Sequence, residues 1–282
     1  MWAGRNQLDA KLWRSPLAKP TPNPDDPFDR VNYRGVIAWP ARIEREWPFL
    51  EWGLRTAPER SVVDLGCGTG EHARFLAARG FRAVGIDKSA AQIRKAEEYA
   101  NVSDLCGPRY IEADMLALPE LVSERFGAAL SLGNVLPYLE DADLEPRMQA
   151  VAQVLRPGGR LLVQLLNYAR ILADGVRHLP LNFRPDPEVA DGEIVWVRLM
   201  RAAGPKHVLF HPVTLRTRPG HEPPVEIQSA REVRLRAWTL PELDVLLQRC
   251  GFADLQAFGD MARTEFDPST SNDLIFAATR RD

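Results

Sequence analysis

The chain has 282 residues, of which 45% are hydrophobic and 26% are charged, and both fractions are ordinary for a globular protein with a sizeable core. The formal net charge of −2 excludes a strongly basic protein that binds nucleic acid through many phosphate contacts. No apolar run approaches the ~20 residues of a membrane-spanning helix, and no secretory signal pattern is visible. The three scattered cysteines form neither a disulfide framework nor a paired metal-binding motif. We therefore expect a cytoplasmic protein with no nucleic-acid partner, no membrane partner and no metal site.

Residues 1–30 differ in character from the rest of the chain. Prolines recur in a polar stretch between Pro16 and Pro27, which predicts a flexible arm, although an arm that folds over a site is also open. Apolar and aromatic residues return over 32–54. Pro40 and Pro48 predict that this stretch forms several short helices.

Strand-like and helix-like segments then alternate. A capping box at Ser89 and Gln92 predicts where one of the helices begins. Strands that alternate with helices at this spacing predict a parallel sheet covered on both faces. The expected strands are 61–65, 83–86, 109–113, 127–132 and 160–166, and the expected helices are 71–79, 89–100 and one around 148–155.

The alternation of strand-like and helix-like segments ends after about residue 168. Three longer β-like stretches, 193–203, 206–217 and 224–238, predict a small antiparallel β insert over 179–238. The insert is expected either to form one side of the substrate pocket or to form a dimer contact. Both alternatives stay open, and the second would make the protein a homo-oligomer. Arg231, Arg234 and Arg236 predict a solvated basic face on this insert.

The alternation resumes after the insert. Thr239 and Glu242 form a capping box that predicts one more helix, and strands are expected at 253–258 and 273–279. The expected core therefore consists of residues 31–178 together with 239–282.

A glycine-rich turn follows the first strand, with the sequence DLGCGTG at 64–70. Glycines let the backbone approach a ligand closely, and the following helix directs its N–H groups toward it. The dinucleotide fingerprint GxGxxG would require glycine at Glu71, where a carboxylate would repel a pyrophosphate, and no phosphate-binding Gly-Lys-Ser/Thr follows. The turn therefore predicts a ligand without phosphates near it.

Acidic residues follow the next two strands. Asp87 lies where a carboxylate can accept both ribose hydroxyls of an adenosine. Asp114 could accept an adenine amino group, and Met115 could cover the ring. His72, after the turn, is expected to cap its helix or to be exposed. His207 and His211 are expected on one strand, where residues four apart lie ~13 Å apart, too far for a metal pair.

With these residues in place, the stretch 61–166 resembles a class I S-adenosylmethionine-dependent methyltransferase. The resemblance implies a Rossmann-like α/β fold with a seven-stranded sheet, and it implies S-adenosylmethionine as cofactor with S-adenosylhomocysteine as product. The runs LGNVLPY at 132–138 and NYARIL at 167–172 are similar to the glycine N-methyltransferase-like branch, which acts on small molecules.

The resemblance also implies roles for individual residues. Arg42 would bind the carboxylate of the methionine part, and Leu132 would present a backbone group to its amine. Asn134, Tyr138 and Tyr33 would lie around the methyl acceptor and form the candidate catalytic set. The expected cofactor-binding residues are Arg42, Asp64, Gly66, Cys67, Gly68, Gly70, Asp87, Lys88, Asp114, Met115 and Leu132.

The acceptor is less determined than the cofactor. Leu166 stands where the branch has an arginine for a glycine carboxylate, so we expect glycine to be a poor acceptor and a less charged amine or hydroxyl compound to be a better one, although Arg170 or an arginine of the insert could restore the charge. N-methylation is favoured over O-methylation. The alternatives are a methyltransferase of a protein or another macromolecule, and a non-catalytic cofactor-binding protein.

Overall fold

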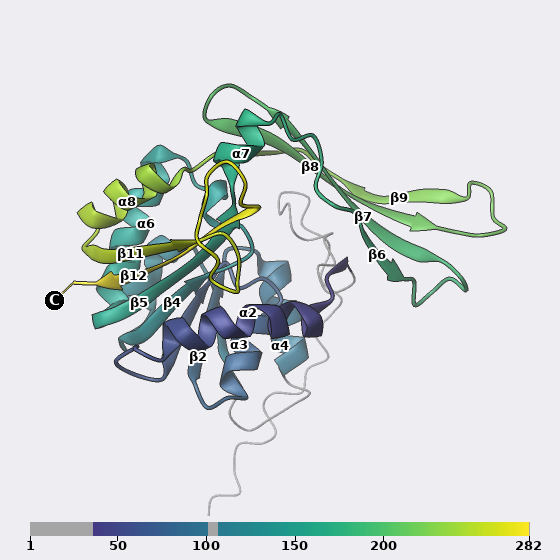
Figure 1. Ribbon diagram of the computed structural model, residues 1–282. Helices are drawn as coiled ribbons and strands as arrows, with labels where there is room; N and C mark the ends of the chain where they lie inside the picture. The colour runs from purple at the N-terminus through teal and green to yellow at the C-terminus, as the bar shows by residue number, and fades with distance from the viewer. Residues whose placement is uncertain (1–35, 101–106, 282) are drawn as a thin grey trace, which may run out of the picture.

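The computed structural model describes residues 36–100 and 107–281, so the expected arm at 1–30 and Tyr33 lie outside the described residues. Its centre is a seven-stranded sheet in the order β11-β12-β5-β4-β1-β2-β3 (Figure 1). β12 runs antiparallel to both of its neighbours, whereas the strands from β5 to β3 are parallel. The strands are β1 Ser61–Leu65, β2 Arg82–Asp87, β3 Arg109–Glu112, β4 Phe126–Ser131, β5 Leu155–Leu166, β11 Phe252–Phe258 and β12 Asp273–Arg280. The expected α/β fold with helices on both faces is confirmed.

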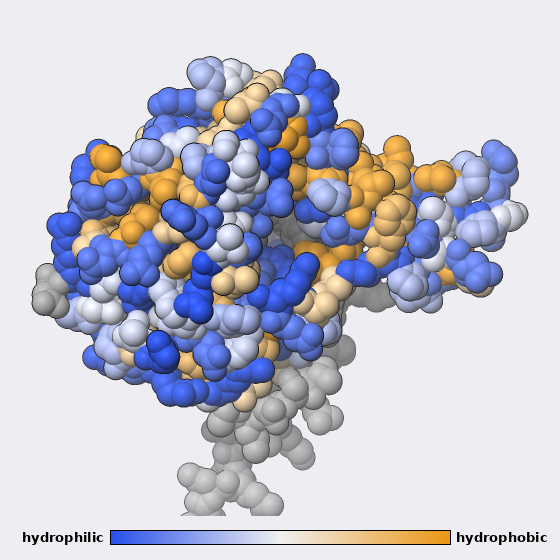
Figure 2. Space-filling view, viewed as in Figure 1, coloured by the Kyte–Doolittle hydropathy of each residue, from blue (hydrophilic) through white to orange (hydrophobic). Residues whose placement is uncertain are grey.

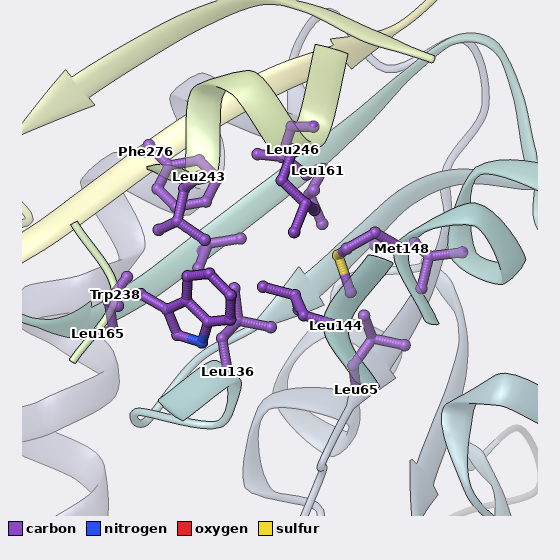
Figure 3. Packing of buried hydrophobic residues seen from close by; sticks show 14 of the residues in the cluster. Leu65, Leu136, Leu144, Met148, Leu161, Leu165, Trp238, Leu243, Leu246 and Phe276 are labelled. Atoms are coloured by element: carbon purple, nitrogen blue, oxygen red, sulfur yellow. The ribbon is translucent and has the colours of Figure 1, made fainter. Parts of the chain in front are cut away.

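Two hydrophobic clusters cover the two faces of the sheet. Successive residues of β1 point to opposite sides, so Val62 belongs to one cluster and Val63 to the other. Helices α2 (Trp39–Leu54) and α3 (Glu71–Ala77) cover the first face. Helices α6 (Asp141–Val154) and α8 (Leu240–Arg249) cover the second, where Leu144, Met148, Leu243 and Leu246 pack against strand residues such as Leu161 (Figure 3). The two short helices α5 (Leu118–Leu121) and α7 (Tyr168–Ala173) complete that side, and α4 (Ala90–Ala100) packs against β2 and β3.

Helix α2 is continuous, so the expectation of several short helices was wrong. Pro40 lies in its first turn, where a backbone N–H has no helical partner to lose. Pro48 lies inside the helix and is exposed. The two residues after it, Phe49 and Leu50, are fully buried. The free energy gained by burying these two side chains against the sheet offsets the loss of the backbone hydrogen bond that Pro48 cannot donate.

The insert is a separate antiparallel sheet of five strands, two more than expected. The stretch 224–238 divides into two strands because its first part pairs with one end of β8 and its second part with the other end, so the chain turns between them. The edge strand β6 was missed because it is only four residues long. The strands are β6 Asn182–Pro185, β7 Glu193–Ala202, β8 His207–Thr217, β9 Val225–Ala230 and β10 Val233–Arg236.

A buried arginine attaches the insert to the core. Arg236 is 1% exposed, so the expectation that it lies on a solvated face was wrong. Its guanidinium pairs with Asp141 at 3.0 Å and with Glu242 at 2.6 Å, which belong to α6 and α8. The sheet of the insert, with β6, β7, β8 and β9 labelled, extends outward from the core (Figure 1). Over residues 36–100 and 107–281, none of the helices has the length and apolarity to cross a membrane.

Candidate active site

The glycine-rich turn adopts a backbone that side chains would disturb. Gly66, Gly68 and Gly70 have φ angles of 65°, 54° and 77°, in the left-handed region. A Cβ at Gly66 would lie 2.8 Å from the side chain of Val135, and a Cβ at Gly70 would lie 2.3 Å from the Tyr110 hydroxyl. The glycines therefore fix the shape of the turn at the carboxyl end of β1.

Two backbone N–H groups hold the carboxylate of Asp87. Gly68 N donates to Oδ2 at 2.9 Å, and Ser89 N donates to Oδ1 at 2.9 Å. The first bond ties the end of β2 to the glycine-rich turn of β1. Asp87 is thus oriented before any ligand arrives, which suits a residue that binds a ligand through paired hydrogen bonds.

A first cavity of about 310 Å³ lies along the carboxyl ends of β1, β2, β3 and β4. Open α/β sheets bind ligands at this edge. Asp64 and Gly70 are not among its lining residues: both are buried, and the Tyr110 hydroxyl donates to the backbone oxygen of Gly70. The expected residues that line the cavity are Arg42, Gly66, Cys67, Gly68, Asp87, Lys88, Asp114, Met115, Leu132 and Tyr138.

Several carboxyl groups lie close together beneath the glycine-rich turn. Asp64 is 2% exposed, and burial raises its pKa to about 6, with smaller contributions from nearby carboxylates such as that of Asp87. Its Oδ2 atom accepts no hydrogen bond from the described residues. Glu71 accepts from Thr69 Oγ1 at 2.5 Å and pairs with Arg74 at 3.0 Å, so it faces these groups. A ligand with positive charge suits such a site, because a cation lowers the cost of ionising Asp64.

A charged network joins helix α2 to the turn. Arg42 Nε donates to Glu46 Oε1 at 2.6 Å, and His72 Nε2 lies 2.6 Å from Glu46 Oε2. Burial alone would raise the pKa of Glu46, but His72 and Arg42 hold it at about 2. His72 is 5% exposed and lines the first cavity, so the expectation that it caps its helix or is exposed was wrong. Trp39 stacks edge-on against its ring at 5.5 Å.

Asp114 makes a two-point ion pair that the sequence did not indicate. Arg147 of α6 donates to its two carboxylate oxygens at 2.9 and 2.8 Å. The backbone N of Leu116 donates to Oδ1 at 2.9 Å, which caps the short helix η1 at Met115–Ala117. Burial would raise the pKa of Asp114, but Arg147 and this N–H lower it, so the residue stays ionised at the cavity wall.

A second cavity of about 940 Å³ adjoins the first and lies between the core and the insert. In Figure 2 the surface is hollowed where the insert leaves the core. Core residues such as Leu166 and Asp273 form one wall, and insert residues such as Asn182 and Arg198 form the other. The two cavities share Ile37, Arg42, Gly133, Tyr138 and Trp196.

The candidate catalytic residues occupy different positions around this junction. Tyr138 lies on the shared wall, at the end of the short helix η2 (Leu136–Tyr138). Asn134 lines the second cavity with a left-handed φ of 69°. Its Nδ2 lies 2.8 Å from the Tyr168 hydroxyl, and its Oδ1 accepts from Leu166 N at 3.0 Å, so it also fixes the end of β5.

Several residues at the two cavities were missed because no motif contains them. Glu46 offers a weak signal, an acid four residues after Arg42 on a helix with a buried face. Arg198 and Asp273 offer none, because their meeting depends on how the insert and β12 are placed. The missed residues are Trp39, Glu46, Arg147, Gln164, Trp196, Arg198 and Asp273.

Comparisons with known proteins agree with this geometry. Residues 62–159 match a family model described as a methyltransferase domain. A glycine/sarcosine N-methyltransferase of Parasynechococcus marenigrum (strain WH8102) is 32% identical over 151 residues, which cover 53% of this chain and 51% of the relative. A glycine N-methyltransferase of Rattus norvegicus is 30% identical over 125 residues, covering 40% of this chain and 43% of the relative. The chain thus spans about half the length of these curated relatives.

Solved structures share the fold over most of the chain. An S-adenosylmethionine-dependent methyltransferase from Clostridium acetobutylicum superposes with a TM-score of 0.69 at 15% identity, covering 90% of this chain and 96% of that one. The sugar N-methyltransferase KedS8 from a Streptoalloteichus species gives a TM-score of 0.64 at 19% identity, with 100% and 99% covered. Together with the glycine-rich turn and the oriented Asp87, the match over residues 62–159 identifies a methyltransferase domain in this chain, and the fold is that of S-adenosylmethionine-dependent methyltransferases.

Proposed function

We propose that this protein transfers a methyl group from S-adenosylmethionine to an amine nitrogen of a small molecule. Relatives of about 30% identity are named as N-methyltransferases of glycine and sarcosine, and KedS8 is named as a sugar N-methyltransferase. These names support nitrogen as the acceptor atom and a small molecule as its carrier.

The observation that carries the proposal is the pair of adjoining cavities. The first lies along the strand ends at the glycine-rich turn, and the second opens from it past Arg42, Gly133 and Tyr138. Two substrates held in these cavities would meet at the shared wall. The second cavity, at about 940 Å³, has the size for a small acceptor and is closed on one side by the insert.

The residues of the first cavity fit the proposed cofactor. Asp87 would accept the ribose hydroxyls, Arg42 would pair with the methionine carboxylate, and Asp114 would accept from the adenine amino group. The acidic group beneath the turn, which includes the buried Asp64, favours the positively charged methionine end. When bound, the cofactor supplies an activated methyl group that a lone pair can attack in line.

The residues of the second cavity would align the acceptor. Asp273 begins β12, and burial raises its pKa although Gln164 donates to it at 2.9 Å. Its carboxylate can accept a hydrogen bond from an amine N–H, and Tyr138 on the shared wall can orient the same group. The amine must lose a proton before it attacks, and solvent can take that proton, so this chain need not supply a dedicated base.

The test measures S-adenosylhomocysteine formed from S-adenosylmethionine with a panel of amines and their hydroxyl counterparts of matching skeleton. We expect turnover with at least one amine, and lower turnover with its hydroxyl twin. Asp273→Asn should reduce kcat/KM for that amine, while the exposed Asp267→Asn should leave it unchanged. Turnover confined to hydroxyl compounds or to macromolecules would contradict the proposal. Cofactor binding without any transfer would instead support a non-catalytic protein.

A further inference from the structure

The second cavity contains an arginine that forms no ion pair with the residues that the structure describes. Arg198 comes from β7 of the insert and lines the second cavity. Its NH2 group donates to two neutral oxygens, Pro180 O at 2.8 Å and Asn182 Oδ1 at 3.3 Å. Its buried Nε atom finds no acceptor, and its guanidinium forms no ion pair within the described ranges.

The surroundings make this positive charge costly. Burial lowers the pKa of Arg198, and the neighbouring Arg42 lowers it further, while Asp273 acts in the opposite direction. Arg198 also lies over the ring of Trp196, with its guanidinium carbon 4.6 Å from the ring centroid. A half-buried guanidinium that has no anionic partner among the described residues gains from one, because charge-assisted hydrogen bonds are among the strongest in proteins.

The strand pattern directs Arg198 and its neighbours to one face. Asn182 pairs with Trp196 in register, and Arg184 pairs with Ile194, so Asn182, Arg184, Trp196 and Arg198 share a side of the insert. Arg184 also lines the cavity, and its Nε likewise has no acceptor among the described residues. Arg216 on β8 differs, because Asp186 and Glu188 already neutralise it at 2.5 and 2.7 Å.

We propose that Arg198 binds an anionic group of the methyl acceptor, a carboxylate or a phosphate, while the amine of the same molecule faces the shared wall beside Asp273. The proposal rests on the proposed function and specifies its substrate class as amines that carry an anion. It differs from the expectation of a less charged acceptor and takes up the alternative that an arginine of the insert supplies the positive charge, here from the wall opposite Leu166.

The experiment measures binding, so that it does not depend on turnover. Protein saturated with S-adenosylhomocysteine is titrated calorimetrically with matched pairs that differ in the anion: sarcosine and sarcosinamide for a carboxylate, and phosphoethanolamine and ethanolamine for a phosphate. In at least one pair, the compound that carries the anionic group should bind about tenfold or more tightly than the compound that lacks it. The pair that shows this difference identifies the kind of anion.

Three variants assign the effect to Arg198. Arg198→Gln should reduce the preference for the anion to about threefold or less, and Arg198→Lys should retain part of it. Arg201→Gln is the matched control, because Arg201 lies on the same strand, is exposed and does not line this cavity. It should leave the preference unchanged.

Two results would overturn the inference. Either no compound with the anionic group binds more tightly than its partner without it, or the preference for the anion survives in Arg198→Gln. Failure of the proposed function looks different. In that case the anionic amine binds through Arg198, but no S-adenosylhomocysteine forms from S-adenosylmethionine when the amine is present.

Discussion

The two cavities are built in different ways. The first is lined mainly by short runs that directly follow β1, β2, β3 and β4, with added side chains such as Arg147 of α6 and Trp196 of the insert, and backbone groups fix much of its shape, as in the bonds from Gly68 N and Ser89 N to Asp87. The second is assembled by side chains from α2, β5, β12 and the insert, which are far apart in the chain. A site formed by the ends of the core strands can be retained, with its ligand, in many proteins that share the fold. A site formed by an inserted sheet can change the molecule that it binds while the first cavity keeps its ligand.

Glu46 lines the second cavity and contacts Arg42 and His72, which line the first, and its loss should have the largest effect. Its pKa of about 2 lies below the ordinary 4.5, so its stabilisation is complete above pH 4.5 and is lost as the pH falls toward 2. Glu46→Gln should therefore reduce the free energy of unfolding at pH 7 by about 3 kcal/mol. Urea denaturation at pH 7 and pH 3 measures this, and the difference between variant and wild type should shrink at pH 3.

Glu44→Gln provides the control for this prediction. Glu44 lies on the same helix and is exposed, so its substitution should change the free energy of unfolding by less than about 0.5 kcal/mol. Equal stability of Glu46→Gln and wild type at pH 7 would show that the network with Arg42 and His72 contributes nothing.

Arg236 tests whether the insert is an independent region. Arg236→Gln removes a buried guanidinium from between Asp141 and Glu242, both of which water can reach in part. We expect a loss of about 2 kcal/mol in the free energy of unfolding, below the full cost of an unpaired buried charge. Arg234→Gln, at a side chain that is 59% exposed on the same strand, should have little effect. If Arg236→Gln left the unfolding curve unchanged, the insert would not depend on this attachment.

Asp87 tests the first cavity without affecting the second. Asp87→Ala removes a charged acceptor of hydrogen bonds worth ~1.5–3 kcal/mol each at most, so affinity for S-adenosylhomocysteine should fall at least about tenfold. Glu112→Ala is the control, because Glu112 pairs with Asp87 in register on β3 but is exposed and does not line the cavity. Calorimetry that gave the same dissociation constant for Asp87→Ala and wild type would contradict the proposed role.

Asp64 should give the smallest effect, a pH dependence of cofactor binding. Its pKa of about 6 in the ligand-free protein lies above the ordinary 3.8, so it is largely protonated below pH 6. A cationic ligand favours the ionised form, and affinity for S-adenosylmethionine should therefore weaken severalfold between pH 7 and pH 5. Calorimetric titrations across this range measure the effect. Asp64→Asn should flatten the profile, and an unchanged profile in that variant would assign the effect to another group.

The sheet core and most of the first cavity could be predicted from local sequence patterns. The alternation of strands and helices, the glycines of the turn and Asp87 all depend on local backbone rules: a strand repeats every two residues, and a left-handed φ favours glycine. Residues that follow neighbouring parallel strands meet at one edge without further information. This is why most of the expected cofactor-binding residues line one cavity.

Features that depend on contacts between distant segments could not be predicted in this way and follow from the folded structure. Packing of Phe49 and Leu50 keeps α2 continuous through Pro48. Burial beside Glu46 places His72 at the cavity wall, and the position of the insert brings Arg198 to the same cavity as Asp273. A side chain's burial and its electrostatic partners come from segments far away in the chain, and no local pattern encodes them.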